Sequence, residues 1–236
     1  MITFHIITIF PELFDSRTKV GLLSKAIEKG LIAINYINPR SFTTDRHQTI
    51  DDKIYGGGEG LLMKAKPIID SVNSVIETLT PHQSGNKPGF LILYPSPSHT
   101  YFDQHSAFDV VDRINDSSLS DIIFVCGRYE GIDHRFEQYF MDRYPQQFLK
   151  ISLGKYIVYG GEVPTMIIIE AITRLLPGGT HKPPIDESYY PHIGDDTIEN
   201  PHFTRPQEIY GYQIPEILIS GHHKHIENWR KDNLTK

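Results

Sequence analysis

The sequence has little cysteine, and what it lacks excludes several classes of site. Its single cysteine, Cys126, cannot form an internal disulfide and ends an apolar run, where we expect it to be buried. No spacing of Cys and His matches a structural zinc site, and the residues alone indicate no metal ligands. We expect His222, His223 and His225, which flank a lysine, to be a solvated helix start.

The N-terminus lacks the positive charges of a signal peptide. It also reaches Pro11 before an apolar run could span a membrane, so no membrane partner is expected. The expected location is therefore cytoplasmic.

Basic residues are fewer than acidic residues. Lys and Arg number 23 against 29 Asp and Glu, a formal net charge of −6. This balance excludes a strongly basic protein that coats nucleic acid, but it does not exclude an RNA partner, because local patches decide binding. With 39% hydrophobic and 22% charged residues, the 236-residue chain has the composition of an ordinary globular protein. Its length suits one large domain, or one domain with a small appendage.

Apolar periodicity alternates between strand and helix along the first three quarters of the chain. The predicted strands are 2–9, 31–37, 90–94, 121–126 and 148–152. The predicted helices are 13–29, 67–79 and a stretch around 108–111. This alternation indicates an α/β domain whose mostly parallel sheet is covered by helices on both faces.

The character of the sequence changes after residue 176. Six prolines between 177 and 206 interrupt every possible element, which favours an interdomain linker or a loop that orders on binding. The remaining residues, 207–236, end in a short predicted helix over 225–231 and are too few to bury a full core alone. We therefore divide the chain into residues 1–176, 177–206 and 207–236.

Three glycine-rich loops are candidate ligand sites. The first, DDKIYGGGEG at 51–60, fits neither a phosphate loop nor a dinucleotide fingerprint, and a flexible turn explains it equally well. The second, CGRYEGID at 126–133, follows a predicted strand, where open parallel sheets bind ligands. The third, at 152–164, is a short extended piece between glycines that is suited to offering backbone groups to a purine edge.

The order and spacing of these loops resemble the bacterial tRNA (guanine-N1)-methyltransferase family, TrmD. The resemblance covers nearly the whole chain. It rests on IFPELF (9–14), PRSFT (39–43), DRH (45–47), YGGG (55–58), CGRYEGID (126–133), GGEVP (160–164), PHFTRP (201–206) and IENWR (226–230).

The resemblance implies a SPOUT-type α/β fold with a deep trefoil knot, plus a small C-terminal helical domain that holds tRNA. It also implies a homodimer with its active site at the subunit interface. The implied reaction transfers a methyl group from S-adenosylmethionine to N1 of guanosine at tRNA position 37, and the family implies a Mg²⁺ dependence.

Residue roles follow from the matched motifs. The resemblance assigns to the cofactor pocket Tyr94, Ser96, Pro97, Gly127, Leu153, Gly154, Lys155, Tyr156, Ile157, Val158, Gly160, Gly161 and Pro164. It places Glu130 near the cofactor and the target guanine, and it matches Arg174 to an arginine that contacts the guanine. Guanine N1 must lose a proton to attack the methyl group, so a carboxylate would serve as general base and a cation would stabilise charge on O6.

The chain departs from the family at the expected base. The usual Asp-Ser-aromatic element reads Glu187-Ser188-Tyr189 here, preceded by Asp186. Because an extra methylene moves the carboxylate by about 1.5 Å, three alternatives stay open. In the first, which we favour, Glu187 is the base and works through a shifted backbone. In the second, the loop slips by one residue and Asp186 is the base. In the third, the pair is a solvated acidic pair in a protein that binds RNA but is impaired in catalysis. A smaller departure, Ser98 in place of the usual glutamine, removes a long amide near the pocket.

The expected RNA contacts are local. Arginines that match tRNA- or guanine-contact regions are Arg40, Arg46, Arg174, Arg205 and Arg230. Binding through such residues should weaken steeply with salt, with a slope set by the phosphates contacted.

Overall fold

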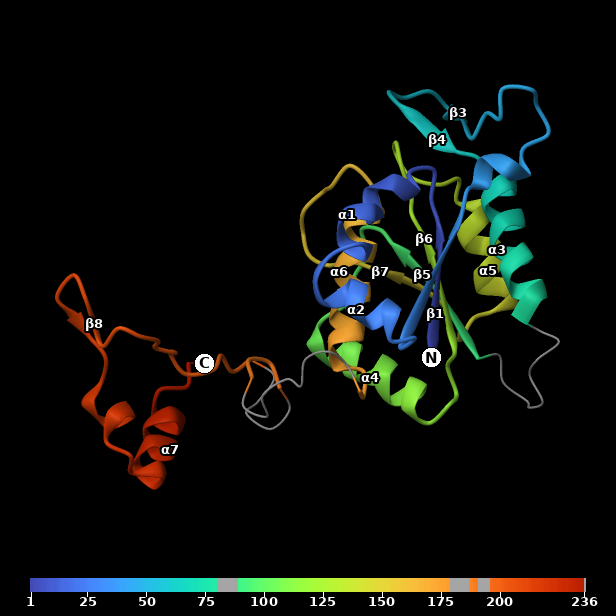
Figure 1. Ribbon diagram of the computed structural model, residues 1–236. Coiled ribbons are helices and arrows are strands. Elements are labelled where there is room, and N and C mark those ends of the chain that lie inside the picture. The colour runs from blue at the N-terminus through green and yellow to red at the C-terminus, as the bar shows by residue number, and fades with distance from the viewer. Residues whose placement is uncertain (80–88, 179–186, 191–195, 236) are drawn as a thin grey trace. The chain divides into compact units, whose positions relative to one another are not determined.

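The computed structural model describes residues 1–79, 89–178, 187–190 and 196–235 (Figure 1). The chain forms two compact units, Met1–Lys182 and Pro183–Lys236. Our three-part division at 176 and 206 stays a prediction.

The first unit is built on a five-stranded parallel sheet with the order β2-β1-β6-β5-β7. The strands are β1 (Ile2–Ile7), β2 (Ile32–Ile37), β5 (Phe90–Pro95), β6 (Asp121–Val125) and β7 (Phe148–Ile151). β5 and β6 are buried throughout, which explains their continuous apolar sequences, because helices cover both faces of a parallel sheet. The five predicted strands are therefore confirmed, with ends that differ by one or two residues.

Helices cover the two faces of the sheet and enclose two hydrophobic cores (Figure 1). On one face α2 (Gly21–Glu28), α4 (Gln104–Asn115) and α6 (Glu162–Leu175) contribute Ala26, Val110 and Ile168 to the first core. On the other face α3 (Ala65–Leu79) and α5 (Arg135–Arg143) contribute Val72 and Phe136 to the second core. The apolar residues recur at helical spacing, so each helix buries one stripe against the sheet.

The predicted helix over 13–29 is wrong as a single element. It is a 3-10 helix (Pro11–Phe14), a short α1 (Asp15–Thr18) and then α2, which starts at Gly21 with φ +76°. That backbone angle suits glycine and cannot continue a helix, so the chain turns between α1 and α2. A further 3-10 helix, Pro39–Phe42, follows β2.

Some elements have no counterpart among the sequence predictions. A hairpin of β3 (Asp51–Lys53) and β4 (Leu61–Met63) carries the first glycine loop, and α5 follows the second loop. In the first glycine loop, Gly56, Gly57 and Gly58 all have positive φ angles, which reverse the chain within a few residues. The glycines thus form the turn of a hairpin, in agreement with the plainer of the two interpretations.

The second unit has short elements and little buried surface. It contains a hairpin of β8 (Glu208–Ile209) and β9 (Tyr212–Gln213), a 3-10 helix (Glu216–Ile219) and α7 (His223–Asp232), which contains the predicted terminal helix. Phe203 and Trp229 contact each other with ring centroids 6.3 Å apart, and α7 has no buried residue. Within the described parts of the chain, no helix is both long and apolar enough to span a membrane.

Candidate active site

A cavity of about 320 Å³ lies where β5, β6 and β7 end. This is the edge at which open parallel sheets bind ligands, because the loops that leave neighbouring strands meet there. Its lining comes from three segments: residues 94–97 at the end of β5, residues 127 and 129–131 after β6, and residues 151–154, 156–161 and 164 from the end of β7 onward. The cavity thus collects two of the three glycine-rich loops that the sequence singled out.

Tyr94 forms the floor of this cavity at the end of β5. Its side chain is buried against Phe136, with ring centroids 5.4 Å apart. Burial raises the pKa of the Tyr94 hydroxyl, and a hydrogen bond with Ser96 partly offsets the rise. A Cβ on Gly127 would lie 3.3 Å from the Tyr94 hydroxyl oxygen, so glycine lets the β6 loop approach the ring.

Gly161 joins the second and third loops through their backbones. Its N–H donates to the carbonyl oxygen of Gly127 over 2.9 Å. A Cβ on Gly161 would lie 2.8 Å from the Cα of Cys126, a backbone atom that cannot move without distorting β6. This wall of the cavity therefore requires glycine because two backbones touch.

Glu130 is the only charged side chain among the described residues that line the cavity. Its N–H donates to the carbonyl oxygen of Leu61 over 3.0 Å, which ties the second loop to β4. Its side chain lies over Gly60, where a Cβ would be 2.6 Å from the Glu130 Cγ. The cavity consequently combines one negative charge with backbone and aromatic surface.

The lining also includes residues that the sequence analysis did not assign, above all Tyr129 and Tyr159. Tyr129 has a positive φ of 58°, and burial raises the pKa of its hydroxyl, as does Asp51, while Arg40 lowers it. A positive φ at a tyrosine is unusual, and such angles cluster at functional sites. Only its place between Arg128 and Glu130 in the CGRYEGID loop could have identified this residue.

Twelve of the thirteen residues assigned to the cofactor line this one cavity, and Lys155 is the exception. The residues assigned to the chemistry are not brought together in the same way. Glu130 lines the cavity, whereas Arg174, in the last turn of α6, lines a separate one of about 310 Å³ with Val20 and Leu23. Glu187 belongs to the second unit, and Asp186 lies outside the described residues.

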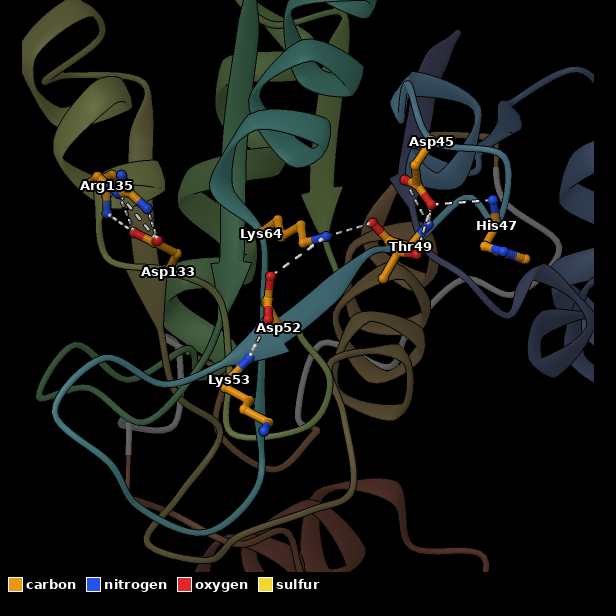
Figure 2. Close-up of polar contacts among 8 residues, drawn as sticks. All are labelled: Asp45, His47, Thr49, Asp52, Lys53, Lys64, Asp133 and Arg135. Carbon is orange, nitrogen blue, oxygen red and sulfur yellow. Dashed lines mark hydrogen bonds and ion pairs between the residues drawn. The ribbon is translucent and has the colours of Figure 1, made fainter.

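A third cavity, of about 620 Å³, lies beneath the β3–β4 hairpin and is lined by charged side chains. Figure 2 shows Lys64 between Asp52, 3.9 Å from its Nζ, and the carbonyl oxygen of Thr49, to which it donates over 3.4 Å. Asp133 and Arg135 pair beside them, and the guanidinium holds the pKa of the Asp133 carboxyl below its usual value. The hairpin is held next to the second loop by backbone hydrogen bonds, from Met63 N–H to the carbonyl oxygen of Gly131 and from Asp133 N–H to that of Met63.

Comparisons with known proteins agree with the motifs. The family model described as tRNA (Guanine-1)-methyltransferase TrmD matches residues 2–236. A tRNA (guanine-N(1)-)-methyltransferase of Carboxydothermus hydrogenoformans is 42% identical over 228 residues, which cover 96% of this chain and 80% of that protein. Proteins with the same description from Clostridioides difficile and Pseudomonas entomophila are 36% and 35% identical, and the alignments cover 97% and 96% of this chain and 90% and 82% of those proteins.

Proposed function

This chain belongs to the tRNA (guanine-1)-methyltransferase family TrmD, and we propose that it transfers a methyl group from S-adenosylmethionine to N1 of the guanosine at tRNA position 37. The observation that carries the proposal is the cavity at the ends of β5, β6 and β7, which gathers twelve of the residues assigned to the cofactor. As a member of this family, the chain is an enzyme that methylates tRNA.

The lining of the cavity fits S-adenosylmethionine better than a nucleotide phosphate. When bound, S-adenosylmethionine supplies a methyl group activated by a positively charged sulfur. Glu130 and the faces of Tyr94 and Tyr156 are suited to that positive charge, whereas a phosphate would meet Glu130 without a lysine or arginine in the lining. The backbone groups of 153–161 would hold the adenine through hydrogen bonds.

The chain's own side chains would prepare the guanine for reaction. A carboxylate, Glu187 or Asp186, would accept the proton from guanine N1 and leave its electron pair to form the new N–C bond. The electrons of the broken bond to the methyl group would stay on the donor, so the charge of the transfer would balance. Arg174 would stabilise the negative charge that builds on guanine O6. The target base must leave its stack to reach the cavity.

One chain does not place Arg174 at the cofactor cavity. Pro164, in the first turn of α6, lines the cavity, whereas Arg174 lies ten residues later, about 15 Å further along the helix axis. We propose that a second copy of the chain supplies Arg174, so that the active site lies at the interface of a homodimer.

Exposed apolar side chains support this assembly. Val163 and Ile167, one turn apart on α6, are 51% and 49% exposed. Leu13 on the neighbouring 3-10 helix and Phe10, just before that helix, are 45% and 42% exposed. Contiguous exposed apolar surface of this kind is typical of subunit interfaces. A second copy would cover it.

Three further features are proposed on the family resemblance. The loops after β6 and β7 would form a deep trefoil knot, 177–206 would link the domain of residues 1–176 to the C-terminal region, and 207–236 would bind tRNA. Within the described residues, no three His, Cys, Asp or Glu side chains converge as metal ligands. A Mg²⁺ dependence is proposed on the family resemblance alone.

The test is a methylation assay with labelled S-adenosylmethionine and two tRNA transcripts that differ only at position 37. The guanosine transcript should be methylated at N1, and the adenosine transcript should give no signal. Equal methylation of both transcripts would contradict the assigned position. Binding of tRNA and S-adenosylmethionine without turnover would favour the alternative, an RNA-binding protein that is impaired in catalysis.

A further inference from the structure

A buried ion pair lies immediately behind the wall of the cofactor cavity. Glu162, the first residue of α6, is 1% exposed, and its Oε2 lies 2.9 Å from the Nε of Arg128. Its other oxygen, Oε1, accepts a hydrogen bond of 2.9 Å from the hydroxyl of Thr8, which follows β1. One carboxylate thus joins the end of β1, the loop after β6 and the start of α6.

Neither charged residue lines the cofactor cavity. Arg128 and Glu162 instead line a smaller cavity of about 280 Å³, whose lining also includes residues 157–160. Residues 157–160 line the cofactor cavity as well. This loop therefore lies between the two cavities, with the ion pair on its far side.

The ion pair also contacts the loop directly. A guanidinium nitrogen of Arg128 donates to the carbonyl oxygen of Tyr159 over 3.5 Å, and a Cβ on Gly160 would lie 2.5 Å from the Arg128 Nε. The guanidinium carbon lies 4.8 Å from the ring centroid of Phe10. Because Tyr159 is almost fully exposed, few other contacts restrain this part of the loop.

We propose that Arg128 and Glu162 are positioning residues for the methyl donor, a role that rests on the proposed function. The pair fixes the 157–161 loop against the 127–131 loop and so sets the width of the cavity between them. Loss of Arg128 would leave the buried Glu162 carboxylate without a cation, and loss of the Glu162 charge would free Arg128 to move with the loop. Because neither residue lines the cofactor cavity, the pair acts on donor binding through the position of the loop.

This role predicts a separation of kinetic constants. In Glu162→Gln the side chain keeps its shape but loses its charge, and Kd and KM for S-adenosylmethionine should rise about tenfold or more, because displacements on the order of 1 Å have large effects in such sites. The value of kcat at saturating donor should stay within about threefold of wild type, since interactions lost equally from ground and transition state raise KM alone.

A matched control separates positioning from stability. Asp121, at the amino end of β6 and therefore away from the cavity, is also buried, and its Oδ1 lies 2.9 Å from the Nε2 of His5. Asp121→Asn thus makes the same carboxylate-to-amide change in another buried pair. Both single variants should lower Tm, whereas only Glu162→Gln should weaken donor binding.

The experiment measures Kd for S-adenosylmethionine by calorimetry, Tm and steady-state constants on the full-length protein. Wild type, Glu162→Gln, Arg128→Met, the double variant and Asp121→Asn are compared. The double variant, Glu162→Gln with Arg128→Met, should bind S-adenosylmethionine no more weakly than whichever single variant binds it more weakly. The reason is that the effects of two residues that act as one unit do not add. If Glu162→Gln does not fold, Arg128→Lys replaces it, because lysine keeps the charge but loses the planar fork. Its Kd for S-adenosylmethionine should rise above the wild-type value but less than that of Arg128→Met.

Two results would overturn the proposal. Donor affinity in Glu162→Gln could equal that of wild type despite a lowered Tm, or Asp121→Asn could weaken donor binding as much as Glu162→Gln does. Wild-type protein that fails to bind S-adenosylmethionine would instead contradict the proposed function itself.

Discussion

The cofactor cavity and the side chains assigned to the guanine differ in how the molecule holds them. The cavity is one continuous site in the first unit, made of three loops that leave buried parallel strands and touch through their backbones. Arg174 lies at the far end of α6 in another cavity, and Glu187 belongs to the second unit. On the proposed function, a single chain would hold the methyl donor, and a second copy and the RNA would complete the site for the acceptor.

The largest effect should separate chemistry from donor binding. Glu187→Gln removes the favoured general base, and kcat should fall by about 10²- to 10⁴-fold while Kd for S-adenosylmethionine stays that of wild type. Asp186→Asn is the matched control, because it makes the same change one residue earlier. If Asp186→Asn abolishes turnover and Glu187→Gln does not, the base is Asp186 and the alignment of this loop shifts by one residue.

The opposite separation is expected for Gly161→Ala. Its Cβ would lie 2.8 Å from the Cα of Cys126, so the two loops must move apart, and Kd for S-adenosylmethionine should rise about a hundredfold. Gly57→Ala is the control: no atom lies within 4 Å of its Cβ, and only its positive φ of +82° carries a cost, about 1 kcal/mol of folding free energy. Unchanged donor affinity in Gly161→Ala would contradict the placement of the donor in this cavity.

Salt should distinguish the two substrates. If three phosphates are neutralised by arginines such as Arg205 and Arg230, tRNA binding should weaken about 40-fold between 50 and 200 mM salt. Binding of S-adenosylmethionine to a cavity with one charged side chain should change little over the same range. Arg205→Gln should reduce the tRNA slope by about one, and a flat tRNA response would contradict recognition through arginines.

The smallest effect is expected at Tyr94. Tyr94→Phe keeps the ring against Phe136 but removes the hydroxyl that bonds with Ser96, so donor affinity should fall only a few-fold, or about 1 kcal/mol. The measurement is calorimetric titration with S-adenosylmethionine. A loss as large as that of Gly161→Ala would mean that the hydroxyl binds the donor directly.

The sequence was most informative where burial is complete. β5 and β6 have buried side chains throughout, and their unbroken apolar runs predicted them to within one or two residues. The hairpin of β3 and β4 was missed because each strand has three residues and most of its side chains are not buried. The helix over 13–29 was predicted as continuous because apolar spacing does not reveal that Gly21 adopts a positive φ.

The candidate site was predicted unevenly for a similar reason. Motif matching found Gly161, where a Cβ would meet the backbone of Cys126, and Gly160, where it would meet the side chain of Arg128. It did not find the pair of Arg128 and Glu162, because the contact joins residues 34 positions apart and neither residue lines the cavity. Lys155, assigned from its neighbours, is exposed outside the lining, since sequence adjacency does not determine the direction of a side chain.

The central claim, that two copies complete each active site, is tested most directly by mixing two inactive variants. With S-adenosylmethionine held near the wild-type Kd, Gly161→Ala binds too little donor to react, and Arg174→Gln lacks the guanine contact. If one copy supplies the cavity and the other supplies Arg174, subunit exchange creates dimers with one intact site, and tRNA methylation should recover to about a quarter of the wild-type rate. Activity that stays at the level of the separate variants after exchange would show that a single chain supplies both, contrary to this account.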